Sequence, residues 1–209
     1  MKTETLINAM NRIVDIYDMS KYDSEIDLYR IRDIANSFVS DQISSKEWLV
    51  NEVMKFREEA NLYGFSFLIA GGWYGLLGHL FKERNNDFVV VSVDMDPMCE
   101  TLGFMLFPGI NFITDDIYDV IHETRMDHSW LINTSCEHME QDDIDFLLQA
   151  KAEHTFVCLQ SNNMFNEASH INCHKTLEDF VKSLDLKHIF KSFEMDLHSG
   201  YKRFMVIGK

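Results

Sequence analysis

The chain has 209 residues, 46% of them apolar and 25% charged, which is enough to bury the core of one domain with a small appendage. The formal net charge of -15 excludes a broad basic surface, and with it a protein that coats nucleic acid through its phosphates. A local basic groove stays open, so nucleic acid is an unfavoured partner. No apolar run approaches the roughly 18 residues that a membrane-spanning helix needs, so we expect no membrane partner.

Cysteine and histidine spacing gives no metal signature. The four cysteines lie beside apolar residues and no two have C-x-x-C spacing, so we expect reduced thiols in a cytoplasmic protein. His170 and His174 flank Cys173, which suggests zinc, but no second pair of cysteines or histidines stands at ligand spacing. The sequence therefore predicts no metal site.

The first 62 residues have the apolar spacing of three amphipathic helices. Ser44 and Glu47 form an S-x-x-E pattern, which predicts that the third helix begins with a capping box. We expect residues 1–64 to form a helical cap on the core. The apolar positions on which this rests are Leu6, Met10, Ile13 and Tyr17, then Ile31, Ile34 and Phe38, then Leu49, Val53, Phe56 and Ala60.

After Gly64 the pattern changes to short apolar runs that alternate with helical segments, which favours a doubly wound α/β sheet. A helix near Thr176 to Leu184 then leads to an antiparallel hairpin, with strands Ile189–Leu197 and Tyr201–Ile207 around Gly200. Residues 65–209 are thus predicted to be one Rossmann-like domain. Its first five strands are expected at Phe65–Ala70, Phe88–Val93, Ile110–Thr114, Trp130–Asn133 and Thr155–Gln160.

A glycine-rich turn follows the first of these strands, in the segment Ala70-Gly71-Gly72-Trp73-Tyr74-Gly75. Glycine lets the backbone approach a ligand closely, and the following helix offers unpaired N–H groups. The second strand ends in Asp94, whose carboxylate can accept both hydroxyls of a ribose. Trp73 occupies the position where a dinucleotide site needs its second glycine, so a ligand with few phosphates fits better.

From Phe65 to Lys209 the chain resembles the class I S-adenosylmethionine-dependent methyltransferases. That family has a glycine-rich turn after its first strand, an acidic residue after its second, and an antiparallel last strand. The resemblance implies a seven-stranded sheet and S-adenosylmethionine as cofactor, although Ala70 stands where the family usually carries an acidic residue. It implies cofactor contacts from Ala70, Gly71, Gly72, Tyr74, Gly75, Asp94, Met95, Asp115, Asp116 and Ile117.

Two of these contacts have a competing structural interpretation. The resemblance places Asp115 or Asp116, with Ile117, beside the adenine amino group. Either aspartate is also a suitable N-cap for a helix that begins at Ile117. In the same way, Asp96 and Pro97 fit the N-cap and first residue of a helix after the second strand. Part of the motif that contains Asp94 would then only start that helix.

The polar cluster Asn133 to His138 follows the fourth strand, where a doubly wound sheet opens its crevice. In the resembling family this position faces the transferred methyl group. Asn133 would then fix a polar group of the acceptor, and Glu137 or His138 would take up a proton. The alternative is that Glu137 and His138 begin the helix that contains Ile144, with Asn133 or Ser135 as its cap.

Three functions remain in competition at this stage. The first is a methyltransferase acting on a small-molecule or protein acceptor. The second is a protein that binds S-adenosylmethionine for its cleavage or for regulation, and the third is a nicotinamide-dependent Rossmann enzyme.

Two further side chains near the predicted site have expected roles. Tyr74 is expected to stack on the ligand or cover it, and Lys46 is expected to be a solvated lysine.

Overall fold

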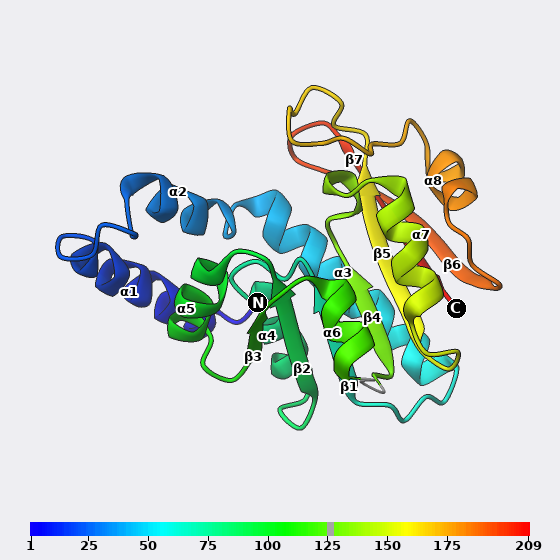
Figure 1. Ribbon diagram of the computed structural model, residues 1–209, viewed down its shortest axis with the longest axis horizontal. Helices are drawn as coiled ribbons and strands as arrows, with labels where there is room; N and C mark the ends of the chain where they lie inside the picture. The colour runs from blue at the N-terminus through cyan, green and yellow to red at the C-terminus, as the bar shows by residue number, and fades with distance from the viewer. Residues whose placement is uncertain (125–127) are drawn as a thin grey trace.

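A computed structural model describes residues 1–124 and 128–209 of the chain (Figure 1). In the described part, the strands form one seven-stranded sheet with the order β3-β2-β1-β4-β5-β7-β6. Strands β1 to β5 pair in parallel, whereas β7 runs antiparallel to both β5 and β6. The strands are β1 (Ser66–Ala70), β2 (Val89–Asp94), β3 (Asn111–Thr114), β4 (Trp130–Asn133), β5 (Phe156–Asn162), β6 (Ile189–Asp196) and β7 (Lys202–Gly208).

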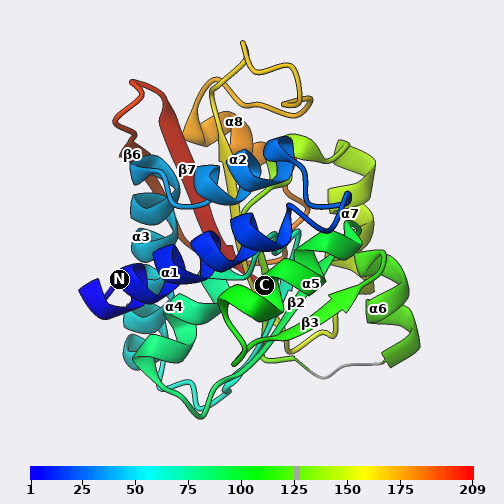
Figure 2. The ribbon, with the colours of Figure 1, turned by 90° about the vertical axis from the view of Figure 1, so that its left-hand side faces the viewer.

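Helices cover both faces of the sheet, which confirms the predicted α/β architecture. Figure 2 shows α3 and α4 on one side of the sheet and α6 and α7 on the other. The helices are α1 (Thr3–Met19), α2 (Leu28–Asn36), α3 (Ser40–Glu59), α4 (Leu76–Arg84), α5 (Pro97–Leu106), α6 (Ile117–Thr124), α7 (Gln141–Ala150) and α8 (Leu177–Ser183), with a 3-10 turn η1 at Cys136–His138. Within the described residues, none of these helices is both long and apolar enough to cross a bilayer.

Alternation along the central strands divides the core into two layers. Phe67 and Ile69 of β1 pack with α1 to α5, while Leu68 and Ala70 pack with α6 to α8. All four side chains are at most 3% exposed, as a parallel strand with helices on both faces requires. This double burial explains why β1 and β4 appear in the sequence as continuous apolar runs.

The strand order reverses between β1 and β4, and this reversal places the site. From β1 the chain moves outward through β2 and β3, and then returns through α6 to β4 on the other side of β1. Parallel strands end at the same edge of the sheet, so the loops after β1 and β4 diverge there and leave a crevice. The predicted cofactor and acceptor residues follow these strand ends.

The beginning of α3 differs from the prediction. The helix starts at Ser40, with Val39 as its N-cap, and no side chain caps it. Ser44 is therefore already helical, and Glu47 instead forms an ion pair with the amino group of Met1. The capping box was the wrong interpretation because a local pattern cannot show which long-range partner a glutamate will take. The predicted starts at Asp96 and Ile117 are confirmed.

Replacing Gly72 by alanine tests the close contact between the turn and β2. A Cβ atom at Gly72 would lie 1.9 Å from Oγ of the buried Ser92. Gly72→Ala should therefore lower the free energy of unfolding by about 1–3 kcal/mol, measured by urea denaturation. Ser92→Ala alone should cost little, because its Oγ has no hydrogen-bond partner among the described residues. The Gly72→Ala, Ser92→Ala double variant should recover much of the loss, and an unchanged loss would contradict the contact.

Candidate functional site

The turn after β1 has an unusual backbone at three positions. Gly71, Trp73 and Gly75 have φ values of 60°, 50° and 85°, in the left-handed region that glycine tolerates and tryptophan rarely adopts. The N–H of Gly72 donates to the carbonyl of Val93 at 3.0 Å, which fixes the turn against β2. Gly71 is exposed and faces the β4 loop, since a Cβ atom there would lie 3.4 Å from Oγ of Ser135. The two loops thus line one crevice.

Asp94 joins the loops of β1, β2 and β3. Its Oδ2 accepts a hydrogen bond from the N–H of Trp73 at 2.9 Å, and its Oδ1 accepts one from the N–H of Asp96 at 3.1 Å. Its backbone carbonyl accepts from the N–H of Asp115 at 3.2 Å. A carboxylate has about four acceptor sites, so each oxygen can still accept a hydroxyl proton. The side chain is half-buried and rigidly oriented at the carboxyl edge of the sheet.

The two aspartates after β3 have different roles. Oδ1 of Asp116 accepts from the N–H of Tyr118 at 2.9 Å and so caps α6, as the structural interpretation requires. Asp115 is exposed, and among the described residues its carboxylate binds only the N–H of Asp116, through Oδ1 at 2.8 Å. Ile117 is buried at 8% exposure, whereas Met95 is 74% exposed. Of this group, Asp115 and Met95 are the better placed to contact a ligand through their side chains.

Tyr74 packs beneath the N-terminal helices and does not face the crevice. Its ring is 1% exposed, and its hydroxyl donates to Oδ2 of Asp33 on α2 at 2.6 Å. Burial raises the pKa of Tyr74 well above its usual value. Trp73 also donates to this carboxylate, through Nε1 at 3.0 Å. The expectation that the Tyr74 side chain stacks on a ligand is therefore not matched, since the ring anchors α2 to the turn.

Asn133 shapes the loop after β4. Its side chain is fully buried, with Oδ1 accepting from the N–H of Ser135 at 2.7 Å and Nδ2 donating to Sδ of Met139 at 2.9 Å. The following residues form the 3-10 turn η1, and α7 begins separately at Gln141 with Glu140 as its N-cap. The alternative that Glu137 and His138 begin α7 is therefore wrong. The predicted contact of Asn133 with an acceptor stays a prediction.

Glu137 is the centre of a buried polar network. It is 4% exposed, and its Oε1 accepts from Nδ2 of Asn162 at 2.9 Å and from the guanidinium of Arg203 on β7. Arg203 also donates to the carbonyl of Thr134, and its Nε lies 3.4 Å from Oε1 of Gln160. The network links the β4 loop to the ends of β5 and β7.

Two histidine rings lie beside this network. His138 is exposed, and its Nδ1 lies 3.0 Å from the carbonyl oxygen of Ser169. Its ring centroid is 4.6 Å from that of His170, in an edge-to-face arrangement. Burial lowers the pKa of His170, which favours a neutral ring near pH 7. The segment that carries His170 is held in place by the N–H of Ile171, which donates to the carbonyl of Glu137 at 2.9 Å.

Lys46 of α3 is buried, so the expectation of a solvated lysine is wrong. The residue is 7% exposed, its Nζ donates to Oε1 of Gln42, and it lies 5.8 Å from the ring centroid of Trp73. Burial, together with the positive charge of Arg203, lowers the pKa of Lys46 to about 7, although Glu137 acts in the opposite direction. An amine of this kind exchanges a proton near neutral pH.

Sequence reasoning did not single out Arg203, Gln160 or Asn162. A charged or amide residue inside an otherwise apolar strand is the signal that could have found them, because burial of such a group requires a partner. The partners lie far away in the chain: 66 residues separate Arg203 from Glu137. Spacing alone could not have paired them.

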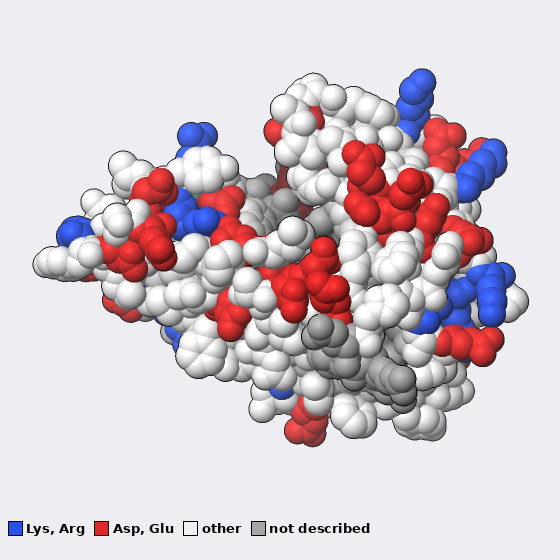
Figure 3. All heavy atoms as spheres, viewed as in Figure 1, with Lys and Arg blue, Asp and Glu red and all other residues white. Residues whose placement is uncertain are grey.

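The surface around the crevice carries acidic groups. Figure 3 shows a hollow between α2 and the segment after β5, with acidic side chains gathered near the first turns of α6 and α7. Those turns contain Asp119, and Asp142 with Asp143. A polyanionic acceptor would be repelled from this rim.

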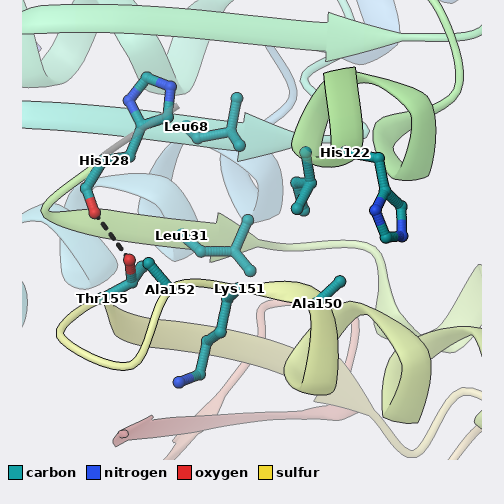
Figure 4. Close-up of a pocket in the computed structure, with 9 residues that line it drawn as sticks. Leu68, His122, His128, Leu131, Ala150, Lys151, Ala152 and Thr155 are labelled. Atoms are coloured by element: carbon teal, nitrogen blue, oxygen red, sulfur yellow. Dashed lines mark hydrogen bonds between the residues drawn. The ribbon is translucent and has the colours of Figure 1, made fainter. Parts of the chain in front are cut away.

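A separate pocket of about 400 Å³ lies on the α6 and α7 face of the sheet (Figure 4). Its walls include Leu68 of β1, Leu131 of β4 and Lys151 after α7. Beside it, Oγ1 of Thr155 donates to the carbonyl of His128 at 2.8 Å. The predicted cofactor and acceptor residues do not line this pocket, so it is distinct from the crevice.

Solved structures provide the comparison that decides the fold. One is the plantazolicin methyltransferase BamL in complex with a triazolic desmethylPZN analog and SAH, with 10% identity and a TM-score of 0.62 over 100% of this chain and 99% of that chain. Another is an O-methyltransferase from Bacillus cereus in complex with SAH, with 8% identity and a TM-score of 0.61 over 95% of this chain and 91% of that one. The chain has the class I methyltransferase fold.

A third structure with this fold is a mutant of MtNAS in complex with S-adenosylmethionine, with 12% identity and a TM-score of 0.58 over 96% of this chain and 72% of that one. No protein-family model and no curated protein matches the sequence. At these identities the likeness shows the fold alone. The function therefore has to be argued from the site.

The buried Lys46 predicts a pH-dependent stability. The folded chain releases this proton near pH 7 and the unfolded chain near 10.5, so between these values the unfolded state binds more protons and stability rises with pH. Lys46→Met removes this contribution. Its free energy of unfolding relative to the wild type should fall by about 2–3 kcal/mol between pH 7 and pH 9, measured by urea denaturation.

The matched control is Lys55→Met, because Lys55 is an exposed lysine of the same helix. Its stability difference from the wild type should not change with pH. A difference for Lys46→Met that is also constant from pH 7 to pH 9 would show that Lys46 stays charged in the folded state.

Proposed function

We propose that this protein is an S-adenosylmethionine-dependent methyltransferase that acts on a small-molecule or protein acceptor. The observation that carries the proposal is the position of Asp94. Two backbone N–H groups orient its carboxylate at the end of β2, beside the exposed Gly71, and acceptor sites remain for the two hydroxyls of a ribose. The fold supports this interpretation, since enzymes with the same architecture are solved with S-adenosylmethionine or SAH.

The residues of the crevice fit such a cofactor from end to end. The methionine portion would lie along the turn from Ala70 to Gly75, where Gly71 leaves the backbone open and Gly72 packs it against β2. Met95 and Asp115 would flank the adenine. Ala70 stands where the family usually carries an acidic residue. The polar partners of the methionine portion would therefore be the N–H groups at the start of α4, which suit its carboxylate.

When bound, the cofactor supplies a methyl group on a positively charged sulfur, and transfer to the acceptor is an in-line displacement. The chain therefore has to position the acceptor and remove its proton. Glu137 or His138 of η1 would take up that proton, as predicted from the sequence, and Arg203 fixes the carboxylate of Glu137. Lys46 of α3 is a further candidate base, because burial lowers its pKa to about 7.

We further propose that residues 1–64 act as a cap over the acceptor. Asp33 binds the side chains of both Trp73 and Tyr74, and Arg30 forms an ion pair with Asp96, so α2 is tied directly to the cofactor turn. The acidic rim and the net charge of -15 disfavour a nucleic-acid acceptor.

The proposal predicts a selective ligand response. S-adenosylmethionine and SAH should raise the midpoint of thermal unfolding, whereas NAD should not, because Trp73 occupies the pyrophosphate approach. Asp94→Ala should weaken S-adenosylmethionine binding about ten- to a hundredfold, the loss expected when about 1.5–3 kcal/mol of hydrogen bonding to a charged group is removed. Isothermal titration calorimetry measures this change directly.

Asp87→Ala is the control, because Asp87 is an exposed aspartate in the turn before β2. It should bind S-adenosylmethionine like the wild type. Asp94→Asn keeps one acceptor oxygen and should give an intermediate affinity, provided that circular dichroism shows the native fold. Stabilisation by NAD and by neither sulfur compound would overturn the proposed function.

A further inference from the structure

Glu137, His138 and His170 bring three metal-ligating atoms together where η1 meets the segment after β5. One carboxylate oxygen and one nitrogen from each ring lie within 4.8 Å of one another. Around a tetrahedral ion with bonds of about 2.1 Å, neighbouring ligand atoms are about 3.4 Å apart, so the three side chains would have to approach one another by about 1 Å to share one ion. The residues come from η1 and from the segment after β5, which are joined by backbone hydrogen bonds to the carbonyl of Glu137.

Two of these side chains have buried polar atoms without partners. Among the residues that the structure describes, Oε2 of Glu137 and Nδ1 of His170 are buried and accept or donate no hydrogen bond. Glu137 itself is 4% exposed. Buried polar atoms in native proteins nearly always have a partner, so two unpartnered atoms in one cluster are places for a water or an ion to bind.

The groups behind the cluster are arranged as the outer shell of a metal site. Asn162 and Arg203 both donate to Oε1 of Glu137, which orients the carboxylate, and Oε2 has no hydrogen-bond partner among the described residues. Nδ1 of His138 lies 3.0 Å from the carbonyl oxygen of Ser169. A carbonyl can only accept, so a neutral His138 carries its proton on Nδ1 and keeps the Nε2 lone pair for a ligand.

We propose that Glu137, His138 and His170 bind one divalent first-row transition-metal ion. Two imidazoles and one carboxylate on one side of the ion leave further positions open for exogenous oxygen or nitrogen ligands. If the proposed function holds, an acceptor hydroxyl binds there and the ion lowers its pKa before methyl transfer. Binding of the ion itself does not depend on that function.

The ligand set also selects against other cations. The charge of the single carboxylate is already offset by Arg203, so electrostatic attraction contributes little to affinity. Mg²⁺ and Ca²⁺ require several oxygen ligands, whereas Zn²⁺, Co²⁺ and Fe²⁺ bind imidazole well. The site should therefore distinguish these two groups of ions.

Cobalt binding to the full chain, freed of metal with a chelator, tests the proposal without the cofactor. Co²⁺ should bind with one ion per chain and produce visible d–d absorption, and Zn²⁺ but not Mg²⁺ should abolish that absorption. His170→Ala and His138→Ala should each weaken Co²⁺ binding by at least about tenfold, as loss of a ligand should cost no less than loss of an outer-shell group. Glu137→Gln keeps an acceptor for Arg203 and removes the ligand oxygen.

His188→Ala is the matched control, since His188 is an exposed histidine outside the cluster. It should bind Co²⁺ like the wild type. Equal Co²⁺ affinity in His170→Ala, His138→Ala and the wild type, or no saturable binding at all, would overturn the proposal. If Glu137→Gln fails to fold, the two histidine variants still decide the outcome.

The proposed methyltransferase function and the proposed metal site can be tested independently of each other. A chain that binds Co²⁺ through these residues but not S-adenosylmethionine would retain the metal site and lose the proposed function. The reverse result would retain the proposed function and remove the metal site. Calorimetric titration of the two ligands in separate experiments distinguishes the four combinations.

Discussion

The buried ion pair between Glu137 and Arg203 is the interaction on which the site depends. Both side chains are at most 10% exposed, so removing one partner would leave an unpaired buried charge, at a cost of about 3–5 kcal/mol. The pair fixes the β4 loop to β7, and the backbone of Glu137 in turn holds the segment after β5. Burial is the main cause of the lowered pKa of Lys46, and the same guanidinium lowers it as well, which connects α3 to this network.

The fold was predictable because burial on both faces gives each parallel strand a continuous apolar run. Trp130–Asn133 is predicted at its observed bounds, and the other strands differ by one or two residues at their ends. The edge position of Asp94 follows from the same logic, since the residue after a buried parallel strand must lie at the carboxyl edge. Strand ends were therefore the part of the site that local patterns could locate.

The remaining features depend on contacts between distant segments. The helical period of α1 predicts Met10 and Tyr17 on the buried face, yet they are 58% and 46% exposed, and Ala9 and Ile16 are buried instead. Periodicity defines an apolar stripe but not the side that a neighbouring helix will cover. Lys46 shows the same limit, because a lysine between polar residues is usually solvated unless the rest of the chain closes over it.

Burial also separates the chemical roles of the two basic side chains. Arg203 uses its donors on Glu137, Thr134 and Gln160 and so acts as a fixed positive charge. Lys46 has a neighbouring amide and an aromatic ring and forms no salt bridge within the described part of the chain, so desolvation dominates its pKa. A fixed charge suits orientation of a carboxylate, whereas an amine that is partly neutral near pH 7 suits proton removal. The network thus combines a fixed positive charge with a group that can exchange a proton.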